Sequence, residues 1–212
     1  GVSIGTTPTA GSVIIASKEH SARAISTRQP IAQAPFNVAA KRLIKSAQWL
    51  HVDHVGIKRL DEVGFSRGDG PQISFDAGYG VENFDPIVVD LFVPTDRQMA
   101  LRYPGVDLAV ALENDSLKAG NTVVATQGSA GSAAFSPETG LVTAPGFKVE
   151  VTSTLGAGDV FHGALVAQLI QGHSLQEALR RANAVAALSC RGLDGQSMIP
   201  TTTELDAYLE AH

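Results

Sequence analysis

The chain has 212 residues, of which 44% are hydrophobic and only 17% charged, and its formal net charge is −5 at pH 7. The low charged fraction, against roughly 25% in an average soluble protein, indicates a sizeable buried core. The negative charge and the lack of basic runs argue against nucleic acid or an anionic membrane as a partner, and no apolar run approaches the ~20 residues of a membrane span. Cys190 is the single cysteine, which excludes a disulfide within the chain and fits a reducing cytoplasm.

The first half of the chain alternates short apolar runs with helical patterns. Two β-branched runs around a polar loop predict a β-hairpin. The two hairpin strands are predicted over 12–16 and 22–27. Further strands are predicted over 49–52, 72–76 and 90–93. Helices are predicted over 38–46, over 57–63 ending at Gly64, and after each of the strands 72–76 and 90–93.

The second half begins with a strand over 121–126 that ends in the turn 127–131, followed by a second hairpin with strands 132–136 and 141–144. The last third is helical. Apolar residues recur every four positions over 156–171, and two further helices begin at the predicted capping boxes Ser174 with Glu177 and Thr201 with Glu204. Strands that alternate with helices predict an α/β fold, with a mainly parallel sheet covered by helices on both faces.

The segment Gly156-Ala157-Gly158-Asp159 carries the strongest chemical signal. A glycine turn that opens a helix leaves backbone amides exposed, and these amides and the helix dipole favour an anion such as phosphate. The Asp159 carboxylate would then stand beside that anion, within reach of a hydroxyl proton. Phosphoryl transfer to an alcohol needs this pairing, because its catalysis is mostly positioning and charge stabilisation. The plain structural alternative is a tight turn with an acidic residue in the first helical turn.

The surroundings of this turn favour the chemical interpretation. It follows the apolar stretch 147–151 and precedes a helix, and a second glycine turn at 126–131 ends another strand about one βαβ unit earlier. Open α/β sheets bind ligands at the carboxyl ends of their strands, so the two turns predict one shared site. The chain has no P-loop motif and no Gly-x-Ser-x-Gly elbow, which disfavours a P-loop kinase and an α/β-hydrolase.

The segment from Thr154 to Ala164 (Thr-Leu-Gly-Ala-Gly-Asp-Val-Phe-His-Gly-Ala) resembles the C-terminal signature of the ribokinase-like, or PfkB-type, carbohydrate kinases. The resemblance runs from about Thr9 to the end of the chain and includes 125–131 and the helix 178–189. It implies the ribokinase-like fold and ATP-dependent phosphorylation of a hydroxyl on a sugar or a similar alcohol. ATP and Mg²⁺ are the implied cofactors, a small-molecule sugar the implied partner, and the cytoplasm the expected location.

The resemblance also implies roles for individual residues. Asp159 would be the general base on the sugar hydroxyl, and the amides of Gly156, Ala157 and Gly158 would form the anion hole for the transferred phosphoryl group. The residues implied to bind ATP are Thr126, Gln127, Gly128, Ser129, Ala130, Gly131, Gly158 and Asn183.

Three features depart from the family pattern. Ser153 stands where the family commonly has an Asp linked to a monovalent cation, which leaves dependence on such a cation open. The family's Asn-x-x-Glu motif, linked to magnesium and phosphate, falls at Thr95 to Gln98 and is neutral at its last position. No residue is therefore assigned as a metal ligand.

The third departure concerns the beginning of the chain. The family's first strands and its glycine-pair sugar motif have no counterpart, so we expect an N-terminally incomplete chain. Residues 1–30 are expected to form part of a β lid, which also mediates homodimers in some members. Residues 31–212 are expected to form the α/β nucleotide- and substrate-binding domain, with the particular sugar left open.

Two other functions stay open at this point. The neutral residues Thr95, Gln98 and Ser153 favour a non-catalytic nucleotide- or sugar-binding paralogue. A hydroxymethylpyrimidine- or pyridoxal-type kinase has a related fold. The lid-like hairpin over 12–27 argues against it, since those relatives generally lack an elaborate lid.

Overall fold

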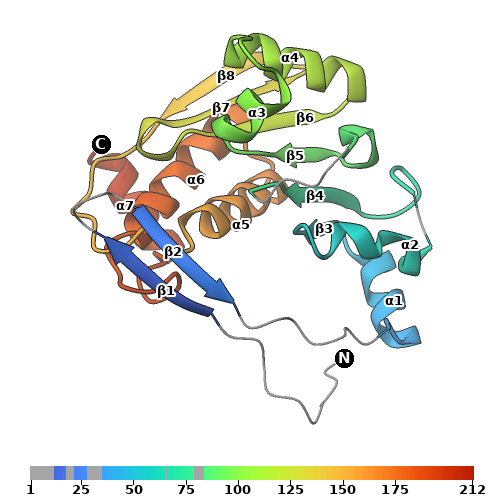
Figure 1. The fold of residues 1–212 in the computed structure, drawn as a ribbon, viewed down its shortest axis with the longest axis horizontal. Coiled ribbons are helices and arrows are strands. Elements are labelled where there is room, and N and C mark those ends of the chain that lie inside the picture. The colour runs from blue at the N-terminus through green and yellow to red at the C-terminus, as the bar shows by residue number, and fades with distance from the viewer. Residues whose placement is uncertain (1–11, 18–21, 28–34, 65, 79–83) are drawn as a thin grey trace. The chain divides into compact units, whose positions relative to one another are not determined.

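The computed structural model describes residues 12–17, 22–27, 35–64, 66–78 and 84–212. The chain forms two compact units, Gly1–Leu43 and Ile44–His212. In the first unit, β1 (Ser12–Ser17) and β2 (Ala22–Thr27) pair antiparallel as the predicted hairpin (Figure 1). The predicted helix α1 (Val38–Ser46) follows, with Lys45 in its last turn, where a positive charge suits the helix dipole.

The second unit is built on a six-stranded sheet. Its order is β3-β4-β5-β6-β7-β8 (Figure 1), and its strands are β3 (Trp49–Val52), β4 (Gln72–Asp76), β5 (Leu91–Val93), β6 (Thr122–Thr126), β7 (Gly131–Ser136) and β8 (Gly140–Pro145). The strands from β3 to β6 are parallel, and β6, β7 and β8 pair antiparallel. The mainly parallel α/β sheet and the second hairpin are thus confirmed.

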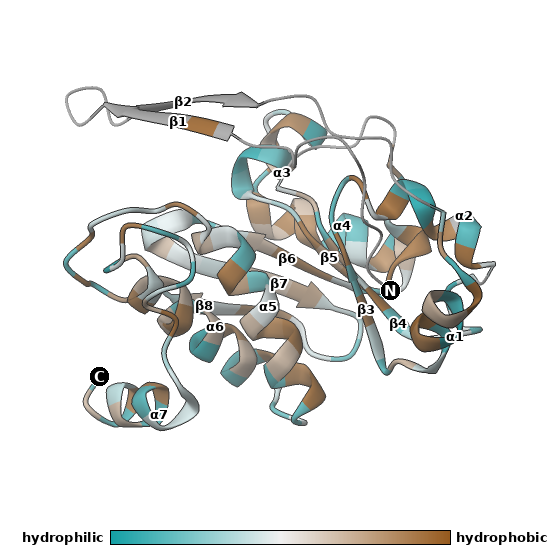
Figure 2. Ribbon diagram, turned by 90° about the horizontal axis from the view of Figure 1, so that it is seen from below, coloured by the Kyte–Doolittle hydropathy of each residue, from teal (hydrophilic) through white to brown (hydrophobic). Residues whose placement is uncertain are grey.

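Helices cover both faces of this sheet (Figure 2). One face packs against α3 (Asp96–Arg102) and α4 (Leu108–Ala119); the other packs against α5 (Ala157–Ile170) and α6 (Leu175–Ser189), with α7 (Thr202–Glu210) against α6. Successive strand residues point to opposite faces, so Val123 and Ala125 enter the first core and Val124 the second. In the described part of the chain, no helix is both long enough and apolar enough to cross a bilayer.

The helix ends follow local sequence signals. Thr201 and Glu204 make both bonds of the predicted capping box, and the Ser174 hydroxyl accepts from the Glu177 amide at the start of α6. α4 ends at Gly120, whose φ of 60° is the left-handed conformation that glycine adopts without strain.

Two predicted helices differ from expectation. The helix over 57–63 is a 3₁₀ turn, η1 (Ile57–Arg59), continued by α2 (Leu60–Val63), and it ends at Gly64 as expected. Between β4 and β5, the described residues contain only a 3₁₀ turn, η2 (Pro86–Val88), so the helix expected after 72–76 is wrong for them. The turn is followed by the extended Val89, and this β-branched stretch leads directly into β5.

A buried carboxylate joins the two helices on the first face. Asp115 of α4 has no exposed surface, and its carboxylate lies 2.7 Å from Arg102 Nε at the end of α3. The Tyr103 hydroxyl donates to the same carboxylate at 2.6 Å. A buried charge with these partners fixes α3 against α4, because losing either partner would leave a charge without compensation.

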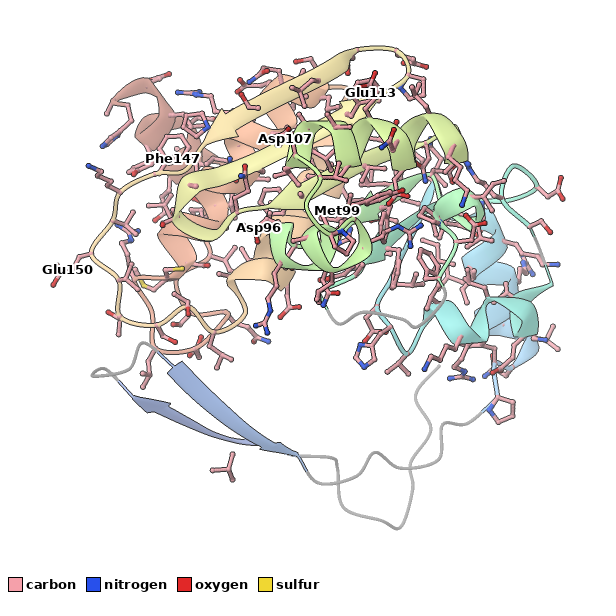
Figure 3. All side chains as sticks on the ribbon, turned by 45° about the horizontal axis from the view of Figure 1, so that its top comes forward. Asp96, Met99, Asp107, Glu113, Phe147 and Glu150 are labelled. Carbon is pink, nitrogen blue, oxygen red and sulfur yellow. The ribbon has the colours of Figure 1, made fainter. Side chains whose placement is uncertain are left out.

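Replacing Asp115 by Ala is therefore expected to lower the free energy of unfolding by about 3 kcal/mol, the scale for breaking a buried ion pair from one side. Urea denaturation measures the change. The matched control is Glu113→Ala, on the exposed face of the same helix (Figure 3), which should stay within about 0.5 kcal/mol of the parent. Equal losses in both variants would contradict the assigned role of Asp115.

Candidate active site

The turn after β6 is shaped by close contact between backbones. Residues 128–130 form the 3₁₀ turn η3 (Gly128–Ala130), and Gly131 then begins β7 with a φ of 105°. A Cβ on Gly131 would lie 2.2 Å from the Ala144 carbonyl oxygen, and one on Gly146 would lie 2.3 Å from the Ser129 carbonyl oxygen. Both distances are shorter than any real contact, so the turn beside the end of β8 requires glycine at both positions.

The start of α5 is the second glycine turn. Gly156 precedes the helix with a φ of 75°, and a Cβ there would come 3.0 Å from Gly195 Cα. A Cβ on Gly158 would meet nothing within 4 Å, and the residue is exposed in the first turn of the helix. First-turn amides have no partner inside their own helix, which makes this end a place where an anion can be held.

One sequence expectation about this turn is wrong. Residues 147–151, the apolar stretch before the motif, are not a strand; the chain runs from the end of β8 to α5 without regular structure. The physical reason lies in exposure, because Val151 is 56% exposed and Glu150 also faces solvent, so this stretch is not buried in the sheet. The α5 turn therefore follows a loop.

The two glycine turns meet at one cavity of about 240 Å³. Of the residues predicted to bind ATP or phosphate, it is lined by Thr126, Gly128, Ser129, Gly131, Ala157, Gly158 and Asn183. Gln127, Ala130, Gly156 and Asp159 do not line it. The remaining lining residues are mostly apolar, among them Phe147, Phe161 and Ala186, and none of the described lining residues is charged.

The Asn183 side chain hydrogen-bonds to backbone carbonyl groups. It is buried in α6, and its Nδ2 donates to the carbonyl oxygens of Ala144 at 2.9 Å and Pro145 at 3.3 Å. These bonds tie α6 to the end of β8, which carries Gly146 into the wall of the cavity. Sequence reasoning placed Asn183 at the nucleotide site but did not find this connection.

Asp159 lies in the first turn of α5 and is exposed. It lines a second cavity, of about 470 Å³, together with residues of α5 and of the segment before α7, including Gly163, Gly195 and Pro200. The predicted base directly follows Gly158 in the first turn of α5, and it does not line the first cavity.

Two residues that depart from the family pattern, Thr95 and Ser153, cap backbone amides. The Thr95 hydroxyl accepts from the Gln98 amide at the start of α3, and the Ser153 hydroxyl accepts from the Leu155 amide before α5. Gln98 Nε2 donates weakly, at 3.5 Å, to the Gly78 carbonyl oxygen. In the described ranges no group of three or more metal-binding side chains occurs.

Sequence reasoning missed a row of polar side chains between the sheet and α5. His51 Nδ1 lies 3.4 Å from Ser74 Oγ, and Ser74 Oγ lies 2.5 Å from His162 Nε2. On the other side of its ring, His162 Nδ1 lies 3.7 Å from Asp76 Oδ2. The members of this row come from three elements, so no single motif contains them. The only signals in the sequence were the position of Asp76 at the end of a strand and the alternation that puts Ser74 and Asp76 on one face.

The row shifts the titration of two of its members. Desolvation, with the nearby His162, lowers the pKa of His51 to about 4, although the residue as a whole is exposed. For Asp76, burial raises the pKa, but contacts with His162 and the Gly78 amide outweigh burial and leave it below its ordinary value. Asp76 is thus ionised and His51 neutral near pH 7.

The free energy of unfolding should therefore fall as the pH is lowered from about 6.5 to about 4. In this window the unfolded chain protonates His51 and the folded chain does not, whereas the loss due to Asp76 begins only below its unfolded pKa near 3.8. Because His51 is exposed, we expect at most about 1 kcal/mol from it. Urea titrations at several pH values measure this; His51→Gln should flatten the change and the control His173→Gln should not.

Known proteins resemble the chain in sequence and in fold. It is 31% identical to a ribokinase of Bacillus subtilis (strain 168) over 116 residues, which are 55% of this chain and 38% of the relative. Its fold matches a ribokinase of Thermotoga maritima with a TM-score of 0.78 at 22% identity, over 96% of this chain and 70% of that one. A candidate ribokinase II of E. coli in complex with ATP and Mg²⁺ matches with a TM-score of 0.73 at 18% identity, over 95% and 71% of the two chains.

The chain spans less than half the length of the curated ribokinase that it matches. The structural matches show the ribokinase-like fold predicted from the sequence. The model of the pfkB family carbohydrate kinases matches residues 88–202, which is more than half of the 212 residues. The chain therefore belongs to the pfkB family of carbohydrate kinases.

Proposed function

We propose that this protein transfers the terminal phosphoryl group of ATP to a hydroxyl of a sugar or a similar alcohol. One observation carries the proposal: both glycine turns line a single cavity, and the α5 turn places Asp159 directly after the Gly158 amide. A phosphate site with a carboxylate beside it is the arrangement that phosphoryl transfer to an alcohol requires. The similarity to ribokinases supports a sugar as the acceptor.

In this proposal the first cavity holds the nucleotide. Its apolar wall, with Phe147 and Phe161, suits a base, and its glycine turns let phosphates approach the backbone amides. The Gly158 amide, with Gly156 and Ala157, would form the anion hole, and 126–131 with Asn183 would line the ATP site. Mg²⁺ would neutralise the phosphate charge; it takes many of its ligands from phosphates and water, so we assign no protein ligand.

Asp159 would accept the proton of the attacking hydroxyl. A carboxylate is a weak base for an alcohol, but the transition state of phosphoryl transfer is loose, so the proton moves late, once the oxygen has begun to bond to phosphorus. The exposed position of Asp159 in the first turn of α5 leaves it accessible to an acceptor.

Asp159→Asn should lower kcat by at least about 10²-fold with little change in the KM for ATP, because it removes the base and keeps the shape. ADP release by the intact protein, with D-ribose, 2-deoxy-D-ribose, D-fructose and inosine as acceptors, measures this. An Asp159→Asn protein with parental turnover would rule out the proposed role.

Gly158→Ala is the companion variant. Its Cβ would meet nothing within 4 Å, and alanine is the better helix former, so the melting temperature should not fall. The methyl group would nevertheless stand where a phosphate must approach the amide, so turnover should drop by about tenfold or more, the scale for losing an oxyanion donor. Normal turnover in this variant would contradict the anion hole.

A non-catalytic paralogue is the second candidate. Thr95 and Ser153 use their hydroxyls to cap backbone amides, and neither offers the negative charge that cation handling commonly uses. If the intact protein binds ATP but phosphorylates no acceptor of the panel, this function is favoured over catalysis.

We further propose that residues 1–30, with the β1–β2 hairpin, belong to a lid that mediates a homodimer, and that residues 31–212 bind nucleotide and substrate. A two-stranded sheet alone is marginally stable, so it gains from pairing with a second copy. Sedimentation of the intact protein should show a dimer, and deletion of 12–27 should give a monomer. A deletion variant that remains dimeric would contradict this.

A further inference from the structure

The polar row between the sheet and α5 has a fixed geometry. His51 of β3 lies directly opposite Ser74 of β4 in the parallel register, and Ser74 and Asp76 are two residues apart, so they point to the same face. That face packs against α5, which supplies His162. Ser74 and His162 are almost fully buried, whereas 20% of the Asp76 side chain remains exposed.

The Asp76 carboxylate determines the hydrogen-bond directions along the row. Asp76 is ionised and can only accept, so we assign the proton of His162 to Nδ1, which faces it. His162 Nε2 then accepts from the Ser74 hydroxyl, and the Ser74 oxygen accepts from His51 Nδ1. The row is thus a one-way chain of donors that ends on Asp76.

The contact at the end of this chain is not closed. The 3.7 Å between His162 Nδ1 and Asp76 Oδ2 is too long for a hydrogen bond, and Nδ1 is buried with no hydrogen-bond partner among the described residues. A buried donor left in this state needs an explanation. Contacts of functional side chains are often long without substrate and tighten when it binds.

Asp76 is also on the side of α5 from which an acceptor would approach. The nucleotide cavity is lined by Thr126 at the end of β6 and by the start of α5, whereas Asp76 ends β4, two strands away in the sheet. Attacking and leaving oxygens lie roughly in line in phosphoryl transfer, so the acceptor comes from the side opposite the nucleotide. His162, which faces Asp76, is three residues after Asp159 and therefore its neighbour on the helix surface.

We propose that Asp76 is a second acceptor-binding carboxylate, which accepts a hydrogen bond from a sugar hydroxyl other than the one phosphorylated, and that His162 is the residue that positions it. The inference rests on the proposed kinase function. Because a carboxylate only accepts hydrogen bonds and repels anions, Asp76 selects neutral polyhydroxylated acceptors over sugar acids.

The test is a split between two KM values in the intact protein, measured with ATP and the sugar of the panel that turns over fastest. Asp76→Asn should raise the KM for the sugar by roughly 10-fold to 100-fold, the loss expected for a hydrogen bond to a charged group, and change the KM for ATP less than about twofold. Asp76→Asn should also reduce the ratio of kcat/KM for that sugar to kcat/KM for its carboxylate derivative. The control is Asp107→Asn, which removes a carboxylate at the start of α4, where asparagine caps equally well.

His162→Asn is the second variant, because its amide can keep a donor near the position of Nδ1 while the bond to Ser74 is lost. It should raise the sugar KM by a smaller factor than Asp76→Asn, and it decides the matter if Asp76→Asn does not fold. A folded variant of either kind with an unchanged sugar KM overturns the inference. If the parent protein phosphorylates no acceptor of the panel, the proposed function itself fails; if the parent turns over a sugar and Asp159→Asn does not, an unchanged sugar KM refutes only the role of Asp76.

Discussion

The close backbone contact at Gly131 and Gly146 is the constraint on which the candidate site depends. Here the parallel part of the sheet gives way to the antiparallel strands β7 and β8, and a Cβ at either glycine would lie within 2.3 Å of a carbonyl oxygen. Because backbone packs on backbone, neither glycine can carry a side chain here. Asn183 holds the same region from the helix side through the Ala144 and Pro145 carbonyls. At this turn the cavity wall is therefore formed by closely packed backbone, whereas apolar residues such as Phe147 and Phe161 line the rest.

The sequence predicted the elements whose signals are local. The capping box of Thr201 and the apolar run 72–76 needed no knowledge of distant residues, and both elements formed where expected. Where the local pattern was weaker, the tertiary structure determined the outcome. Residues 147–151 are apolar enough for a strand, yet they do not pair with the sheet. The two glycine turns do line one cavity, but the expected reason, that both end strands of the sheet, holds only for the turn after β6.

The polar row was not predictable, and its physical basis explains why. Within its own strand, nothing distinguishes His51 from an ordinary polar strand residue, and Asp76 alone is consistent with a strand-end cap. Their meeting depends on the parallel register of β3 and β4, because a shift by one residue would turn Ser74 to the α4 face. It depends equally on the rotation of α5, which brings His162 onto Ser74. No pattern within one element encodes these two quantities.

The carboxylates of Asp159 and Asp76 lie outside the lining of the cavity that is proposed to hold the nucleotide. Among the described residues, none that lines the first cavity is charged, so in the proposed function phosphates entering it would meet no carboxylate. Asp159 lies at the start of α5 and Asp76 at the end of β4. Carboxylates repel a polyphosphate but attract hydroxyl groups, so this separation opposes binding of the two substrates in exchanged positions. The same separation is compatible with neutral residues at Thr95 and Ser153. The two carboxylates, Asp159 and Asp76, would lie on the side where a neutral acceptor is proposed to bind.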